Sequence, residues 1–199
     1  MDAHPLWHCQ IELLDSEPSI WRTFQLPSDK TLAELHELAQ LIMGWQNRHG
    51  YYFEIERGLV GDPPGDRPSA SAAKRRYGSP DLPTTEDPAA LTLGQLNLVP
   101  GTKLIYMYDV QSGWLHQLTF TERLTPTPDT STVLCLDGAM ACPPEDSGGV
   151  WGYEGLLDRL ADIDEPDYEA LLNSVGLDFD PNYFKVEAVN QRLQAGRPT

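Results

Sequence analysis

The sequence predicts an α+β fold with a mixed, largely antiparallel sheet, a helix after the first hairpin and a helical C-terminal part. Three observations favour this class. Strand-like segments with alternating apolar and polar residues come in pairs joined by short turns, an amphipathic helical segment follows the first pair, and leucines recur at helical spacing towards the C-terminus. The order hairpin, helix, strand indicates a β-grasp-like arrangement for the first half.

The overall composition is that of one globular domain. With 199 residues, of which 40% are hydrophobic, the chain can bury a core, and we expect a single domain over 1–199. No apolar run approaches the roughly 18 residues of a membrane span, and the first residues lack the pattern of a secretory signal. The three cysteines are an odd number, which disfavours a disulfide framework, so we expect a cytoplasmic location.

The chain opens with a predicted hairpin. From Leu6 to Leu14, positions 7, 9, 11 and 13 are apolar and positions 8, 10 and 12 are polar, which is the period of a half-buried strand. The segment from Ile20 to Leu26 predicts its antiparallel partner, with Pro18 in the turn between them.

The segment TLAELHELAQLIMG predicts the clearest helix of the chain. Thr31 and Glu34 form a capping box, and Gly44 can close the last turn in the left-handed conformation. We expect His36 on the polar, exposed side of this helix. The apolar face is made of Leu32, Leu35, Leu38, Ala39 and Ile42.

A third strand and a long insertion follow. The alternation from Tyr51 to Glu56 predicts the strand. Residues 58–90 are rich in proline, glycine, serine and alanine, a composition that buries too little apolar surface to offset the cost of ordering, so we expect a flexible insertion. The basic run Lys74–Arg76 within it is weak evidence for contact with nucleic acid.

The remaining elements continue the sheet and then the helices. A short helical turn or loop is expected over Leu91–Leu98, and a glycine-containing turn joins two further strands. The expected strands are Lys103–Val110, Trp114–Thr121 and Thr132–Leu136, and the expected helices are Tyr153–Ala161, Pro166–Val175 and a last one after Pro181.

The stretch CLDGAMACPPEDSGGVWGY, which runs from Cys135 to Tyr153, predicts a rigid corner. Pro143 and Pro144 fix two φ angles and remove two backbone donors. The pair Gly148–Gly149 then permits a sharp reversal. We expect this corner to hold a hairpin and a helix around a small polar hollow.

Five polar residues are the candidate catalytic groups. Asp109 and His116 flank one hairpin turn, so a hydrogen bond between them could orient the imidazole as a general base. The same pair could equally satisfy a buried histidine. The full candidate set is His49, Asp109, His116, Glu145 and Asp146.

The same region holds possible metal ligands. Zinc accepts thiolate, imidazole and carboxylate ligands, so the candidates are His116, Cys135, Cys142 and Asp146. Six residues separate the two cysteines, which differs from the closely paired cysteines of zinc sites. The sequence therefore predicts no cofactor, with zinc or another divalent metal as the alternative.

The charge favours a binding function. The net charge is −16, and between Asp129 and Asp180 thirteen acids face a single base, Arg159. Such a surface repels phosphate backbones and anionic lipid, which disfavours nucleic acid and membranes as partners. The phosphate-binding, dinucleotide-binding, zinc-protease and serine-hydrolase motifs are absent from the sequence. The sequence thus favours a non-catalytic binding or adaptor domain for a basic protein or peptide over an enzyme.

Several motifs resemble a known family. In order, they are WRTFQLPSDKTLAELHELAQLIMGWQNRHGYYFEI, YMYDVQSGWLHQLTF, CLDGAMACPPEDSGGVWGYEGLL and DFDPNYF. They resemble the plasmid pRiA ORF-three-like family, whose members are also described as insertion-element passenger proteins of TnpR type. The resemblance covers nearly the whole chain apart from the insertion and the tail.

The resemblance implies no established activity. Its TnpR label suggests a DNA-processing accessory protein of mobile elements, although the chain lacks the YxRxS motif of a serine recombinase. The chain also departs from the family pattern at two polar positions, since Tyr51 replaces a histidine and Ser112 replaces an aspartate. The positions that match are His49, Asp109, Trp114, His116, Cys135, Cys142, Glu145 and Asp146. A metal-dependent or acid–base enzyme therefore stays an alternative.

Overall fold

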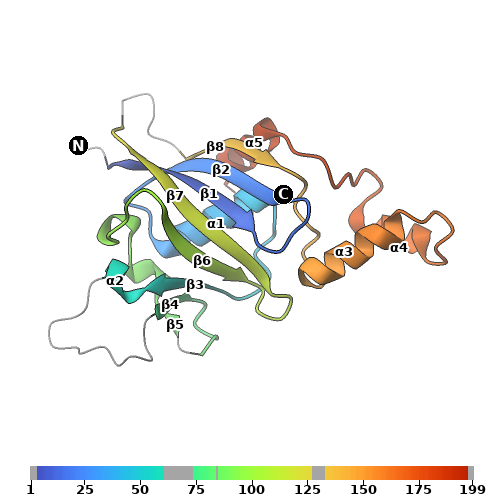
Figure 1. Cartoon of the computed structure of the whole chain (residues 1–199), viewed down its shortest axis with the longest axis horizontal. Helices are drawn as coiled ribbons and strands as arrows, with labels where there is room; N and C mark the ends of the chain where they lie inside the picture. Colours follow the sequence, from blue (N-terminus) through green and yellow to red (C-terminus); the bar gives the residue numbers. More distant parts are fainter. Residues whose placement is uncertain (1–3, 61–73, 84, 127–132, 197–199) are drawn as a thin grey trace.

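A curved antiparallel sheet forms the body of the protein in the computed structural model, which describes residues 4–60, 74–83, 85–126 and 133–196 (Figure 1). Within these residues the strands form one eight-stranded sheet of order β5-β4-β3-β6-β7-β1-β2-β8, in which only β4 and β5 pair in parallel. The strands are β1 (Leu6–Leu13), β2 (Ile20–Pro27), β3 (Tyr51–Glu56), β4 (Lys74–Gly78), β5 (Thr85–Glu86), β6 (Thr102–Tyr108), β7 (Trp114–Leu124) and β8 (Leu134–Ala139).

The helices lie on one face of the sheet and at one end of the molecule. They are α1 (Leu32–Met43), α2 (Arg57–Val60), α3 (Gly149–Leu160), α4 (Tyr168–Val175) and α5 (Val186–Ala195), with short 3₁₀ turns η1 (Pro88–Ala90) and η2 (Leu93–Gln95). The α+β prediction is confirmed. No helix of the described residues is both long and apolar enough to cross a membrane.

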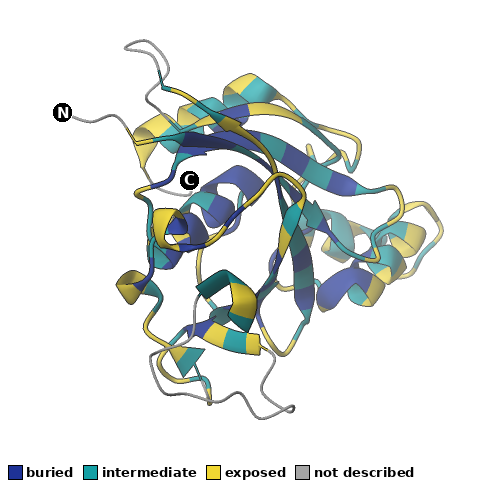
Figure 2. Cartoon of the chain, turned by 60° about the vertical axis from the view of Figure 1, so that its left-hand side comes forward, coloured by how far each residue is buried: buried dark blue, intermediate teal, exposed yellow. Residues whose placement is uncertain are grey.

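The first hairpin follows directly from its sequence period. In β1 the predicted apolar positions are buried, and Cys9 lies opposite Phe24 of β2. On its other edge β1 pairs antiparallel with β7, so β1 is interior to the sheet. The hairpin followed by a helix matches the expected order of the first half. Buried residues of the strands and of α1 face one another across the core (Figure 2).

Helix α1 has the predicted ends, but one of its side chains lies where we did not expect it. The Thr31–Glu34 capping box is formed, and Gly44 closes the helix with a φ of 100°. The expectation of an exposed His36 is wrong, because this residue is only 1% exposed. Its ring stacks on Tyr51 at 3.4 Å, and its Nδ1 lies 2.8 Å from the Tyr106 hydroxyl. The sheet thus supplies the polar partners that allow a histidine to be buried.

The sheet extends into the segment that we expected to be an insertion. Strand β4 pairs antiparallel with β3, so residues 74–78 are strand rather than loop. Lys74 and Arg76 both bond the carboxylate of Glu54 on the neighbouring strand, at 2.7 and 3.2 Å. The basic run is therefore paired within the sheet. Residues 61–73 of the expected insertion lie outside the described residues.

Helices α3 and α4 form an arm that projects from the sheet (Figure 1). Helix α3 begins at Gly149, four residues before its predicted start. In α4 no residue is buried, whereas α5 returns to pack against α1 and β8. The arm, which we define as residues 149–180, therefore contributes little to the core and exposes most of its surface.

Candidate functional site

A cleft of about 720 Å³ separates the sheet from the arm. Its body-side wall comes from the loop after α1 and from the corner Cys142–Ser147. Its arm-side wall includes Gly152, Gly155, Leu156, Arg159 and Phe179. We call this hollow the CPPED cleft, after the sequence of the corner. A hollow thus lies beside the corner, but the loop after α1 lines it in place of the predicted hairpin.

The carboxylate of Glu145 ties the two loops of the body-side wall together. The residue is only 9% exposed, so its carboxylate needs partners within the protein. Its oxygens accept hydrogen bonds from the backbone N–H groups of Gln46, at 3.0 Å, and Arg48, at 3.2 Å. The hydroxyl of Tyr108 donates to the same carboxylate. Burial, and then this bond to Glu145, hold the pKa of Tyr108 well above its usual range.

Two tryptophans anchor the corner to the core. Trp45 donates its indole N–H to the carbonyl of Pro143 at 3.0 Å, and Trp114 donates to the carbonyl of Glu145 at 3.3 Å. Both residues are at most 2% exposed, so their polar atoms need partners in the protein. The corner is therefore held from below by the core and from the side by Glu145.

Glycines let the corner approach its neighbours closely. Gly148 and Gly149 have φ values of 82° and 77°, in the left-handed region. A Cβ on Gly149 would lie 2.1 Å from the carbonyl oxygen of Ser112, and one on Gly152 would lie 2.0 Å from that of Ser147. These contacts fix where α3 begins, as expected for a rigid corner.

Four of the five predicted catalytic candidates gather beside the cleft. His49 Nε2 lies 3.2 Å from Asp146 and 3.9 Å from Asp109, and Glu145 precedes Asp146 in the corner. Asp146 also accepts a hydrogen bond from the Arg48 guanidinium at 3.2 Å. The structure thus places an imidazole between two carboxylates at the surface.

The expected pair of Asp109 and His116 is not formed. With a φ of 48°, Asp109 turns its side chain back onto its own turn, where Oδ1 accepts from the N–H groups of Gln111 and Ser112 at 3.2 and 3.4 Å. His116 points into the core, and its Nδ1 lies 3.3 Å from the carbonyl of Tyr106. Burial lowers the pKa of His116 to about 4. His116 is therefore a neutral core residue that packs against Trp45 and Tyr106.

The predicted metal ligands do not come together. No group of three or more His, Cys, Asp or Glu side chains among the described residues is arranged to hold a metal ion. Cys135 directs its thiol to the carbonyl of Asp137 at 3.7 Å, while His116 packs against Trp45. All three cysteines are free thiols, and burial raises the pKa of Cys142 to about 12.

Sequence reasoning missed three residues of the site: Arg48, Tyr108 and Arg159. Tyr108 lies on the inward period of a strand, and an inward tyrosine needs a polar partner for its hydroxyl. Arg159 is the single base in the acidic segment, where it bonds Glu165 at 2.8 Å and Asp167 at 3.3 Å. The signals for Tyr108 and Arg159 are present in the sequence, although neither signal identifies the residue that the side chain bonds.

Comparison with known proteins identifies a family and a solved structure that match most of the chain. The family described as plasmid pRiA4b ORF-3-like protein matches residues 6–188. The chain belongs to this family. It is 34% identical over 149 residues to the uncharacterized protein y4hQ of Sinorhizobium fredii (strain NBRC 101917 / NGR234), which corresponds to 73% of this chain and 68% of that protein. The family expected from the sequence motifs is thus confirmed.

A solved structure shares the architecture of this ORF-3-like protein. It is the crystal structure of MM3350 from Methanosarcina mazei Go1, a protein of unknown function. The two chains superpose with a TM-score of 0.79 at 27% sequence identity, covering 93% of this chain and 97% of the other. The names of these relatives carry no activity, so the function must be argued from the site.

Proposed function

We propose that this protein is a non-catalytic binding domain that, without a cofactor, captures a cationic and partly apolar segment of a partner protein at the CPPED cleft and along the arm. The observation that carries the proposal is the charge of the arm. From Glu154 to Asp180 it holds nine acids and one base, Arg159, which itself bonds two of those acids.

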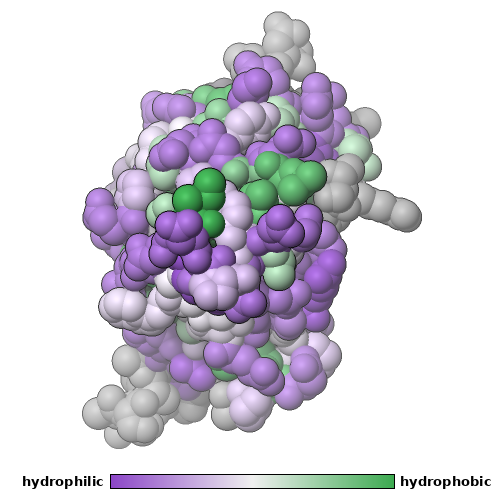
Figure 3. Space-filling view, turned by 90° about the vertical axis from the view of Figure 1, so that its right-hand side faces the viewer, coloured by the Kyte–Doolittle hydropathy of each residue, from purple (hydrophilic) through white to green (hydrophobic). Residues whose placement is uncertain are grey.

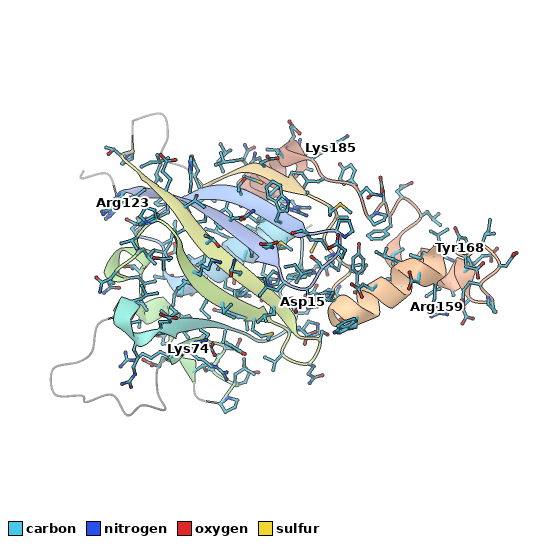
Figure 4. All side chains as sticks on the ribbon, in the orientation of Figure 1. Asp15, Lys74, Arg123, Arg159, Tyr168 and Lys185 are labelled. Atoms are coloured by element: carbon cyan, nitrogen blue, oxygen red, sulfur yellow. The ribbon has the colours of Figure 1, made fainter. Side chains whose placement is uncertain are left out.

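The uncompensated acids create a directional field. The arm extends into solvent, with Arg159 labelled on it in Figure 4. Like charges concentrated on one protruding element attract a cationic partner and raise its rate of association. A purely solvating acidic surface would not require that the charge be gathered on one projecting pair of helices.

Apolar side chains lie among these charges. Trp151, Ile163 and Leu177 are 80%, 77% and 73% exposed. Figure 3 looks onto this end of the molecule and shows apolar groups set within a hydrophilic surface. Exposed aromatic and aliphatic groups supply the contact area that charge alone lacks. An amphipathic basic segment matches both features.

The cleft gives such a segment a place to insert. Its volume of about 720 Å³ lies within the range of ligand pockets. A Cβ added to Gly155, which lines it, would meet no atom within 4 Å. The cytoplasmic location expected from the sequence belongs to this proposal, and free thiols at Cys9, Cys135 and Cys142 support it, since reducing compartments preserve thiols.

The test is fluorescence anisotropy with a short labelled peptide of lysine, arginine and leucine. We expect binding that weakens about tenfold or more between roughly 20 and 300 mM salt. The double variant Asp158→Asn/Asp164→Asn should weaken binding about 3- to 10-fold, and Gly155→Trp, which fills the cleft, should do so more strongly. An acidic peptide of equal length is the ligand control.

Glu122→Gln is the matched control variant. It also removes one exposed carboxylate, but next to Arg123, which Figure 4 places at the opposite end of the molecule from the arm. It should leave peptide affinity within about twofold of the unmodified protein. An affinity that ignores salt and all arm substitutions would remove the proposal.

The acid–base alternative is favoured by one observation, the position of His49 between Asp146 and Asp109. A positioned imidazole beside carboxylates can transfer protons. A hydrolase screen tests it, with elemental analysis of the purified protein for a bound metal. Activity that disappears in His49→Gln without a change in thermal unfolding would establish this alternative, and an inactive, metal-free protein would dismiss it.

The mobile-element alternative, a DNA-processing accessory protein, has less support. The basic run Lys74–Arg76 includes two side chains already bonded to Glu54, and the acidic arm repels phosphates. A gel shift at low salt with duplex and single-stranded DNA decides it, since retarded DNA would revive the idea and free DNA would end it.

A further inference from the structure

A second pocket, of about 250 Å³, lies on the other side of the Ala141–Cys142 segment, between the end of α1 and the chain that leads into α5. Two arginines line it, Arg22 from β2 and Arg192 from α5. They come from positions far apart in the sequence, and neither takes part in the CPPED cleft. We call this hollow the arginine pocket.

Within the part of the chain that the structure describes, the groups that hold the buried cation Arg22 are neutral. Arg22 is 2% exposed, and its terminal nitrogens donate to the carbonyls of Trp21 and Met140, each at 2.7 Å, and to that of Ala139. Its Nε has no hydrogen-bond partner among the described residues. The ring of Phe184 covers one face of the guanidinium at 4.4 Å. Carbonyl dipoles therefore meet part of the charge, and no anionic side chain of the described residues meets the rest.

Arg192 brings a second positive charge to the same place. Its Nε donates to the carbonyl of Leu41 at 3.0 Å, at the negative end of the α1 dipole. Its two terminal nitrogens make no hydrogen bond within the described part of the chain, and they lie close to Gly44, where a Cβ would approach Nη1 to 3.2 Å. Burial, and in the case of Arg22 the nearby Arg192, lower the pKa of both guanidinium groups.

In the described ranges, neither arginine has a carboxylate partner. Among the described residues, no Asp or Glu lies within 4.0 Å of either guanidinium. This is notable in a chain of net charge −16. A buried cation beside a half-buried one, with no anion between them, is electrostatically unfavourable. A ligand that brings a negative charge would offset that cost.

We propose that the arginine pocket binds a small oxyanion, a phosphate or carboxylate group, between Arg22 and Arg192. A planar guanidinium fork with free N–H groups suits such a group, because it can bond two oxygens at once. Lys185 lines the pocket as a third cation, and Asp178 and Asp180 line it as opposing acids. With three cations against two acids, the pocket favours one negative charge over several.

The size of the pocket restricts the ligand further. A volume of about 250 Å³ is smaller than typical cofactor sites, so a nucleotide is excluded and a free anion or a short carboxylic acid fits. Phe184 and Val189 also line the pocket and give an apolar wall. A short monocarboxylate with a small apolar group would use both the arginines and this wall.

One residue of the protein could compete for the role of counter-ion. Cys142 lines the pocket, and its thiolate would be negative. Burial outweighs the two arginines and raises the pKa of this thiol to about 12, so it is protonated at neutral pH. The experiment must nevertheless separate a bound oxyanion from a thiolate, because both would neutralise the same charge.

The test is thermal unfolding and calorimetric titration of the full chain with sodium phosphate, acetate and butyrate. Sodium chloride at equal ionic strength is the reference. At about 100 times the dissociation constant, the preferred anion should raise the unfolding temperature by roughly 5–10 °C. The ranking of the three anions assigns the ligand to phosphate, to a bare carboxylate or to a carboxylate with an apolar group.

Variants assign the effect to the pocket. Arg192→Gln should weaken anion binding at least about tenfold, and Arg192→Lys should restore part of it, since lysine keeps the charge but loses the fork. Arg123→Gln, which removes an exposed arginine at the opposite end of the molecule from the arm, should leave anion binding unchanged. Arg22 is left intact in these variants because its three carbonyl contacts make it part of the fold.

Three outcomes would overturn the proposal. Chloride could stabilise the protein as much as the oxyanions, or the anion effect could persist in Arg192→Gln. Alternatively, thiolate absorbance near 240 nm at pH 7 that is lost in Cys142→Ser would make Cys142 the counter-ion. None of these outcomes bears on peptide binding to the arm, so the two proposals fail independently.

Discussion

Replacement of Glu145 by glutamine tests whether one carboxylate holds the corner of the cleft. The carboxylate is buried and accepts two backbone N–H groups and the Tyr108 hydroxyl. A glutamine has one acceptor oxygen, and its NH₂ group must face at least one of these donors. Leaving one buried donor unpaired and replacing charged by neutral hydrogen bonds should lower the free energy of unfolding by about 2 kcal/mol.

Urea unfolding at pH 7.5 measures this loss. Tryptophan fluorescence is a suitable signal, because Trp45 and Trp114 bond the same corner. For a slope of about 2 kcal/mol per molar, the midpoint should fall by roughly 1 M with the slope unchanged. Asp146→Asn, which changes a neighbouring side chain that is 66% exposed, should shift stability by less than about 0.5 kcal/mol. Equal, small shifts in both variants would refute the clamp.

Two further perturbations have expected outcomes. Burial lowers the pKa of His36 and His116 from 6.5 to about 4, so only the unfolded chain takes up these protons as the pH falls through 6.5. The free energy of unfolding should drop by up to about 3 kcal/mol per histidine between pH 6.5 and 4. Urea unfolding measured at several pH values should show that the free energy of unfolding of His116→Leu falls less steeply with decreasing pH than that of the unmodified protein. Gly149→Ala should cost about 2 kcal/mol or more, because its φ of 77° is unfavourable and its Cβ would meet Ser112, whereas Gly155→Ala in open helix should gain about 0.5–1 kcal/mol. Similar thermal unfolding temperatures for the two alanine variants would contradict the reasoning.

Local patterns predicted the backbone well. The two-residue period places β1 and β2, and Thr31, Glu34 and Gly44 set the ends of α1, because each signal acts within a few residues. The prolines and glycines of the corner act in the same way. Strand β4 was missed because its residues are charged, and its strand character depends on pairing with Glu54 and its neighbours on β3.

Side-chain partners were predicted less well, for a physical reason. His36 was placed by its position on a helix, yet its burial is decided by Tyr106, seventy positions later. Asp109 was matched with His116 by closeness in sequence, although one positive φ angle sent its side chain to its own turn. Sequence reasoning selected His49, Glu145 and Asp146 as candidates, but it could not determine which residues they bond.

Arg22 shows how far such reasoning can be taken. It lies on the same period of β2 as Ile20 and Phe24, so alternation alone places this cation inside the protein. In a chain with this many acids, a missing carboxylate partner does not reflect a shortage of acids. It follows from the fold, because the carbonyls of Ala139 and Met140 accept from the terminal nitrogens of Arg22, and a Cβ on Gly138 would lie only 2.7 Å from the Arg22 side chain. The backbone thus admits the cation while leaving its charge uncompensated, which is the condition under which a small anion gains most by binding.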